Sequence, residues 1–202
     1  MTEGRRRIVR SVLVVLALVM VVLVLGATAY AVRLQLIATA LIDSAQEIHT
    51  TEDALRQIGA WNKRRGTESW TDSYDNGHAT HYYVRLSNGI SGVHIAPWSA
   101  LIMRVTLHDA KLICVTVETS IPTASVVLQE WFKPDMRDEV YLSYAKAAIP
   151  TARLEFPSSL PAAQKRRVFA IRTRCLLIPQ LCATTEDLLP LVRSLELRTT
   201  PD

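Results

Sequence analysis

The sequence predicts an α+β protein with one transmembrane helix at its N-terminal end and a single extracytoplasmic domain. Two observations predict it. An uncharged aliphatic run at residues 11–32 follows a group of arginines. From about residue 67 onward, short segments alternate apolar and polar residues between turn signals. We expect an antiparallel β-meander of five or six strands, packed by helices and with one face buried. The chain has 202 residues, enough for one such domain.

The run at residues 11–32 has the length and composition of a membrane-spanning helix. As a helix it would be roughly 33 Å long, close to the ~30 Å hydrocarbon core of a bilayer. A helix that is apolar on all sides needs apolar surroundings on all sides, which a domain of this size does not offer. The bilayer is therefore the first predicted partner of the chain.

Charge around the apolar run predicts its orientation. The arginines at positions 5, 6, 7 and 10 precede it, so the positive-inside bias places residues 1–10 in the cytoplasm and the C-terminal domain outside. In a bacterial envelope that domain would be periplasmic. A cleaved signal peptide is the alternative, because Ala27-Thr28-Ala29 and Ala29-Tyr30-Ala31 resemble cleavage sites. The run is longer than the ~7–15 apolar residues of a signal peptide, which favours an uncleaved signal anchor.

The net charge of +4 does not indicate a nucleic-acid partner. Of the 23 Lys and Arg and 19 Asp and Glu residues, four arginines and one glutamate lie in residues 1–32, so the remainder is close to neutral. The short clusters Lys63-Arg64-Arg65 and Lys165-Arg166-Arg167 are both expected to be solvated. The excess of basic over acidic residues therefore indicates membrane topology.

Cysteine usage agrees with an oxidising compartment. Cys175 and Cys182 enclose a short apolar loop containing a proline, and we predict a disulfide between them. Cys114 lies in an apolar strand pattern and is expected to be a buried free thiol, although an odd cysteine leaves an intermolecular bridge open.

Helical segments are expected on either side of the membrane boundary and at the C-terminal end. Leu34, Leu41, Ile48 and Leu55 recur every seven residues, a weak heptad seam that could serve self-association or packing on the chain's own domain. Thr50-Thr51-Glu52-Asp53 reads as a helix cap within that stretch. The expected division is a cytoplasmic tail at 1–10, the membrane helix at 11–32, a helical stalk at 33–61, an α+β domain at 62–197 and a tail at 198–202.

Strands are predicted where alternation is clear. Residues 70–74 and 81–86 form a hairpin around Asn76-Gly77, and Asn88-Gly89 makes a second turn. Further strands are expected at 101–107, 112–117, 126–131 and 151–156. Residues 135–147 are assigned to a short helix, with a strand left open. Helices are expected at 161–172 and 184–195, the second opened by Thr184-Thr185-Glu186-Asp187.

The richest candidate for contact with a ligand is the first hairpin. Its loop carries aromatic, acidic and imidazole side chains, and the candidate contact residues are Trp70, Asp72, Tyr74, Asp75, His78 and His81. On a hairpin, Asp72 and His81 would lie on different strands and could pair. His78 and His81 would point to opposite faces of one strand, which argues against a metal site.

These observations favour a non-catalytic function. We expect a membrane-anchored extracytoplasmic domain that binds or assembles, through the hairpin or the stalk, with a protein partner or with itself. Neither a metal nor a cofactor is predicted. The alternative is a membrane-anchored hydrolase that uses Asp72, Asp75, His78 and His81, which would require these four side chains to meet in one cleft.

Overall fold

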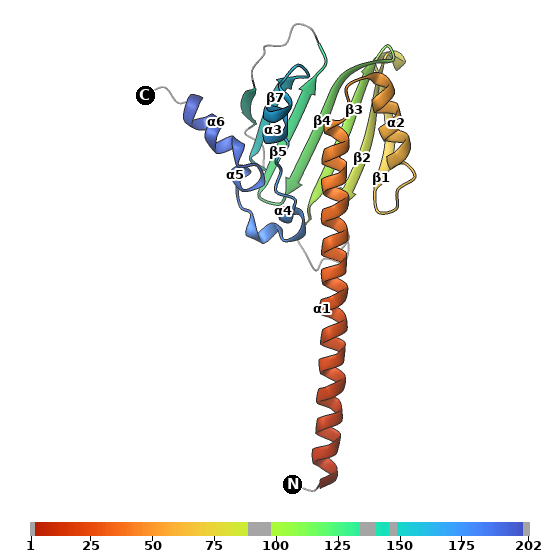
Figure 1. The fold of residues 1–202 in the computed structure, drawn as a ribbon, viewed down its shortest axis with the longest axis vertical. Helices are drawn as coiled ribbons and strands as arrows, with labels where there is room; N and C mark the ends of the chain where they lie inside the picture. Colours follow the sequence, from red (N-terminus) through yellow and green to blue (C-terminus); the bar gives the residue numbers. More distant parts are fainter. Residues whose placement is uncertain (1–2, 89–97, 134–139, 146–148, 200–202) are drawn as a thin grey trace. The chain divides into compact units, whose positions relative to one another are not determined.

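A computed structural model of the chain describes residues 3–88, 98–133, 140–145 and 149–199. It is an α+β protein with a long apolar helix at its N-terminal end and a mixed sheet of seven strands (Figure 1). The chain divides into two compact units, residues 1–36 and residues 37–202.

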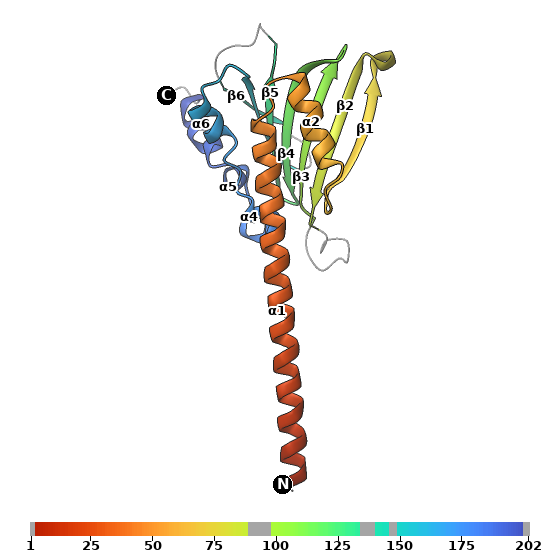
Figure 2. The same cartoon turned by 45° about the vertical axis from the view of Figure 1, so that its right-hand side comes forward.

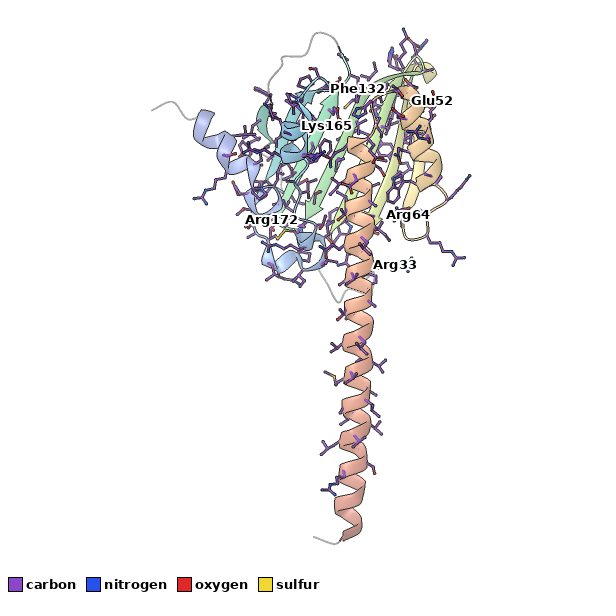
Figure 3. All side chains as sticks on the ribbon, in the orientation of Figure 1. Arg33, Glu52, Arg64, Phe132, Lys165 and Arg172 are labelled. Carbon is purple, nitrogen blue, oxygen red and sulfur yellow. A yellow bond between two sulfur atoms is a disulfide. The ribbon has the colours of Figure 1, made fainter. Side chains whose placement is uncertain are left out.

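The first unit is the N-terminal part of helix α1, which runs from Glu3 to Gln46. The side chains of residues 10–29 are all exposed and project around the whole circumference of the helix (Figure 3). In the part of the chain that the structure describes, α1 is the one helix long and apolar enough to cross a membrane, a test that a signal sequence also passes.

The second unit begins with residues 37–46 of α1, followed by α2 (Thr51–Trp61). The predicted helix break is confirmed, because the Thr50 side chain accepts a hydrogen bond from the backbone N–H of Asp53 and caps α2. The indole N–H of Trp61 donates to the Ser44 hydroxyl at 3.1 Å and ties α2 to α1. Most of the apolar residues between positions 37 and 61 are buried inside this unit; they are Ile37, Ala38, Leu41, Ile42, Ala45, Ile48, Ala54, Ile58 and Trp61.

Seven strands form one sheet in the order β1-β2-β3-β4-β5-β7-β6. Five consecutive strands pair antiparallel, as the sequence predicts; they are β1 (Glu68–Tyr74), β2 (Ala79–Ser87), β3 (Ala100–His108), β4 (Lys111–Ile121) and β5 (Ala124–Trp131). Helix η1 (Asp75–Gly77) makes the turn of the first hairpin, where Gly77 has a φ of 94° that suits glycine. The predicted second turn at Asn88-Gly89 extends into residues outside the described part.

The sheet is mixed rather than purely antiparallel. Strand β7 (Thr151–Pro157) pairs parallel with β5 and antiparallel with the edge strand β6 (Tyr141–Ala145). Ala152, Leu154 and Phe156 of β7 are fully buried, whereas no residue of β6 is. The more apolar strand therefore takes the interior position, although β6 comes first in the chain.

The helix expected at 135–147 is wrong for residues 141–145. They form strand β6, because hydrogen bonding to β7 outweighs a weak helical pattern. Residues 135–139 and 146–147 lie outside the described part.

The C-terminal helices are shorter than predicted. Helix α3 covers only Ala162–Val168, and Pro161 is its N-cap rather than its first residue. Short segments follow: α4 (Arg174–Leu177), η3 (Pro179–Leu181), α5 (Thr185–Leu188) and α6 (Leu191–Thr199). The predicted helix cap at Thr184 is confirmed, and it takes the form of a capping box with Asp187. The helix expected at 184–195 breaks before Pro190, which has no N–H to continue it.

Residues 37–46 of α1 lie on the same side of the sheet as α2 and α3 (Figure 1). Side chains of alternate sheet positions are fully buried, among them Leu101, Met103 and Val105 of β3. Phe156 of β7 meets Phe169 edge-to-face, with ring centroids 5.6 Å apart. We call the opposite side of β1, β2 and β3 the open face.

Candidate functional site

The open face carries four neighbouring aromatic rings, which we call the aromatic ladder: Trp70, Tyr83, His81 and Tyr74. The Trp70 ring lies parallel to that of Tyr83, with centroids 4.8 Å apart, and Tyr74 meets His81 edge-on at 4.9 Å. These rings come together because the β1–β2 register places Trp70 opposite Tyr83. The outer rings remain open to solvent, since Trp70 is 39% exposed and Tyr74 52%.

Charged side chains surround the ladder. Asp72 is the register partner of His81, as the hairpin predicts. Burial and the positive charge of Arg104 lower the pKa of His81, while Asp72 opposes them. The Asp72 carboxylate raises the pKa of Tyr74.

Charged side chains also lie beyond the Trp70–Tyr83 end of the ladder. Arg85 lies 3.7 Å from the Glu68 carboxylate, and its guanidinium group is 5.8 Å from the ring centroid of Trp98. The open face therefore combines exposed aromatic rings with charges of both signs, the composition typical of protein contact surfaces.

A second group of polar residues lies where two turns meet, and we call Asp75, His78, His108 and Asp109 the turn cluster. Nδ1 of His78 is 2.7 Å from Oδ1 of Asp109, and Nδ1 of His108 is 3.4 Å from Oδ2 of the same carboxylate. The backbone N–H of Asp109 donates to the carbonyl of His78. The bond from His78 is the main cause that lowers the pKa of Asp109. These contacts tie the β1–β2 turn to the β3–β4 turn.

The structure distributes the predicted contact residues between these two groups. Trp70, Asp72, Tyr74 and His81 lie in or beside the aromatic ladder, whereas Asp75 and His78 belong to the turn cluster. His78 is not on a strand, because it is the C-cap of η1, so its expected place on a strand face is wrong. Its carboxylate partner is Asp109, which sequence spacing does not reveal. Within the described residues, no three His, Cys, Asp or Glu side chains are grouped to hold a metal.

A buried ion pair lies on the other side of the sheet. Nζ of Lys165 on α3 is 2.6 Å from Oε1 of Glu130 on β5, and their side chains are 7% and 0% exposed. Figure 3 labels Lys165 over the strands that α3 covers. Burial raises the pKa of Glu130 to about 7, although the bond from Lys165 opposes this. The expectation that Lys165 is solvated is wrong, because the sheet places a carboxylate beneath it.

The cysteine loop connects several parts of the domain. Cys175 and Cys182 form a disulfide with an S–S distance of 2.04 Å, which fits the predicted pairing. The carbonyl of Leu176 accepts hydrogen bonds from the Asn88 side chain at 3.2 Å and from the Ser99 hydroxyl at 2.7 Å. The loop therefore fastens both ends of the connection between β2 and β3.

The third cysteine is a buried free thiol, as predicted. Burial raises the pKa of Cys114, so the thiolate needed for nucleophilic chemistry is disfavoured.

No protein-family model, curated protein or solved structure matches this chain. Sequence reasoning did not identify Tyr83, Arg85, Arg104 or Trp98 as neighbours of the hairpin residues. The signal for Tyr83 was present, because a hairpin centred on Asn76-Gly77 that pairs Asp72 with His81 also pairs Trp70 with Tyr83.

Proposed function

We propose that this protein is a membrane-anchored extracytoplasmic binding domain that contacts a partner protein or envelope component through the aromatic ladder. The observation that carries the proposal is the stack of Trp70 on Tyr83, which forms an ordered and partly exposed aromatic surface on the side of the sheet away from α2 and α3. Exposed, preorganised aromatic side chains supply large contact area at low entropic cost, and they dominate many binding hot spots.

The apolar run at residues 11–32 supports an extracytoplasmic location for the domain. Residues 11–32 contain no charge and follow a group of arginines, the arrangement of a signal anchor whose N-terminus stays in the cytoplasm. A disulfide between Cys175 and Cys182 suits an oxidising compartment and would be unusual in a reducing cytoplasm. Both observations favour the same side of the membrane for the domain.

We expect a reporter enzyme that is active only outside the cytoplasm to be active when fused after residue 202. The same reporter fused after residue 10 should be inactive, because positive charge retains that end. Mass spectrometry of the membrane-extracted chain should show that residues 1–32 are retained. A mature N-terminus just after Ala29 or Ala31 would instead show cleavage, and an inactive C-terminal fusion would contradict the location.

Trp70→Ala should weaken capture of the partner about tenfold or more, which corresponds to at least 1.4 kcal/mol and is typical of an aromatic hot spot. The measurement is chemical crosslinking in intact membranes, followed by affinity purification and quantitative mass spectrometry of the attached proteins and envelope material. The free energy of unfolding should fall by only about 0.5–1.5 kcal/mol, because the lost ring is partly exposed and contributes mainly its stack on Tyr83.

Leu55→Ala is the matched control. Leu55 lies on α2 and is 47% exposed, comparable with Trp70, but it does not belong to the open face. We expect this variant to capture the partner as the wild type does. Equal loss in both variants would mean that a general change in folding or abundance explains the effect. Unchanged capture by Trp70→Ala would remove the aromatic ladder as the contact surface.

A further inference from the structure

Several chain segments come together at one end of the second unit, which we call the entry end. It comprises Lys63–Arg65, the start of β1, the end of β2 and the cysteine loop 175–182. Residues 62–67 lead directly from α2 into β1, and the β1–β2 register places the start of β1 beside the end of β2. The side chain of Asn88, which follows β2, donates to the carbonyl of Leu176 and fastens the cysteine loop to the same end.

Helix α1 enters the second unit at the entry end. Helix α2 begins at the opposite end of the sheet, where the Thr51 hydroxyl accepts a hydrogen bond from the backbone N–H of Leu112 at 3.0 Å, and it runs from there to the entry end. Residues 47–50 join α1 to α2, so residue 37 lies roughly 14 Å back along α1 from that opposite end. Figures 1 and 2 both show α4 at the end where α1 enters the unit.

A short stretch of chain separates the entry end from the apolar run. The uncharged run covers residues 11–32, and the second unit begins at residue 37. Five residue steps span at most about 18 Å, even when the chain is fully extended. This bound depends on chain length alone and holds for any orientation of the unit. If a bilayer holds the apolar run, the entry end is therefore within reach of its surface.

The cysteine loop presents two large apolar side chains at the entry end. Ile178 is 50% exposed and Leu181 is 68% exposed, the largest fraction among the described large apolar side chains. The disulfide between Cys175 and Cys182 closes the backbone that carries both side chains. Because the loop is closed in this way, little conformational freedom is lost when the two side chains leave water. Exposed apolar side chains on such a loop suit insertion into the interfacial region of a membrane.

The entry end also carries positive charge that the domain does not neutralise. Lys63–Arg65 and Arg174 are exposed. Within the described part of the chain, the Lys and Arg ion pairs involve other residues, so these four cations have no carboxylate partner there. Glu68, at the start of β1, lies 3.7 Å from Arg85 and is already paired. This surplus of positive charge complements the anionic headgroups of a membrane surface.

We propose that the entry end docks on the surface of the membrane that holds α1. Ile178 and Leu181 insert among the lipids, and the basic side chains contact anionic headgroups. The inference rests on the proposed membrane anchor, but it does not depend on what the aromatic ladder binds. The strands run from the entry end to the turn cluster, so docking would stand the sheet on the membrane and leave the open face accessible from the side.

A photo-crosslinking side chain tests the insertion. The full-length chain with p-benzoylphenylalanine in place of Leu181 is reconstituted into vesicles of phosphatidylcholine and phosphatidylglycerol, illuminated and analysed for lipid adducts by mass spectrometry. Leu55 provides the matched control, because it is an exposed leucine in the first half of α2, away from the entry end. The probe at position 181 should attach lipid several-fold more often than the probe at position 55.

Charge reversal tests the headgroup contact. Lys63→Glu/Arg65→Glu should lower the lipid adducts at position 181 several-fold, and so should vesicles of phosphatidylcholine alone. Arg64 is left unchanged, because its guanidinium group also lies 4.4 Å from the ring centroid of Trp61. Arg166→Glu/Arg167→Glu makes the same change of charge at exposed positions of α3 and should leave the adducts unchanged.

Other outcomes overturn the proposal, and alkaline extraction tells its failure from that of the anchor. A chain that alkaline carbonate removes from the vesicles has no membrane anchor, and docking then loses its basis. A chain that resists extraction but attaches no more lipid at position 181 than at position 55 is anchored without docking. Equal losses in the two charge variants would exclude a specific headgroup contact. None of these results bears on Trp70→Ala, so the proposal for the aromatic ladder can fail separately.

Discussion

Lys165→Met should lower the free energy of unfolding of a fragment spanning residues 33–202 by about 3–5 kcal/mol at pH 8. The substitution leaves the Glu130 carboxylate buried without its cation, and Oε2 of Glu130 already has no hydrogen-bond partner among the described residues. An unpaired buried charge is costly because neither water nor a counter-ion solvates it. Chemical denaturation followed by circular dichroism measures the change.

Two variants separate the charge from other causes. Arg166→Met removes a neighbouring cation from the same helix, but Arg166 is exposed, so we expect a change within about 0.5 kcal/mol. The double variant Lys165→Met/Glu130→Leu replaces both charges by apolar groups and should recover most of the loss. If the double variant is as unstable as Lys165→Met, packing around α3 rather than the ion pair determines stability.

The pH dependence provides a third test of the same pair. The pKa of Glu130 in the folded protein is about 7, above its ordinary value of 4.5. The folded state therefore binds the proton more tightly between these values. The stabilisation that comes from this tighter proton binding by Glu130 is fully present below about pH 4.5 and is lost as the pH rises to about 7. Without Lys165 the pKa should rise further, so the destabilisation by Lys165→Met should be smaller at pH 5 than at pH 8.

Cys175→Ser/Cys182→Ser should lower the free energy of unfolding by about 2–3 kcal/mol. The disulfide closes a loop of sequence separation 7, and its loss would also loosen the carbonyl of Leu176, to which Asn88 and Ser99 donate. We therefore expect faster amide hydrogen exchange at Asn88, whose backbone N–H donates to the Ser99 carbonyl. Denaturation and hydrogen-exchange mass spectrometry measure the two effects.

Reduction of the wild-type protein is the matched control, because it opens the same bond without changing a residue other than the two cysteines. Reduced wild type and the double variant should agree in stability. Alkylation of the denatured chain taken directly from cells should modify Cys114 alone, because the other two sulfurs are bonded. Alkylation of all three cysteines would contradict both the disulfide and the oxidising compartment.

Several elements of the fold could be predicted because their causes lie within a few residues. Thr50 and Thr184 both cap helices, since each hydroxyl needs only a backbone N–H three residues later. The Asn76-Gly77 turn and the alternation on either side of it predict the first hairpin, and with it the pairing of Asp72 with His81. The disulfide between Cys175 and Cys182 likewise closes only a short loop, so the spacing of the two residues in the sequence predicts it.

The candidate site could be predicted only in part. Trp70, Tyr74 and His81 belong to one hairpin, so the contacts among their side chains depend only on local pairing. Arg104 comes from β3 and Asp109 from the β3–β4 turn, and their positions depend on the registers by which β3 pairs with β2 and β4. A one-residue change of register would send each side chain to the other face, and no local pattern specifies that choice strongly enough.

By itself, the sequence determined the apolar membrane-length helix, the antiparallel strands of the meander, the two threonine caps and the cysteine loop, because periodicity, turn residues and short spacing act locally. Only the tertiary structure decided that β7 enters the sheet beside β5, that Lys165 is buried on Glu130 and that β1 is left as an open edge. These outcomes depend on competition among distant segments for buried positions. A strand's place in the sheet and a lysine's burial follow from what the rest of the chain places beside them.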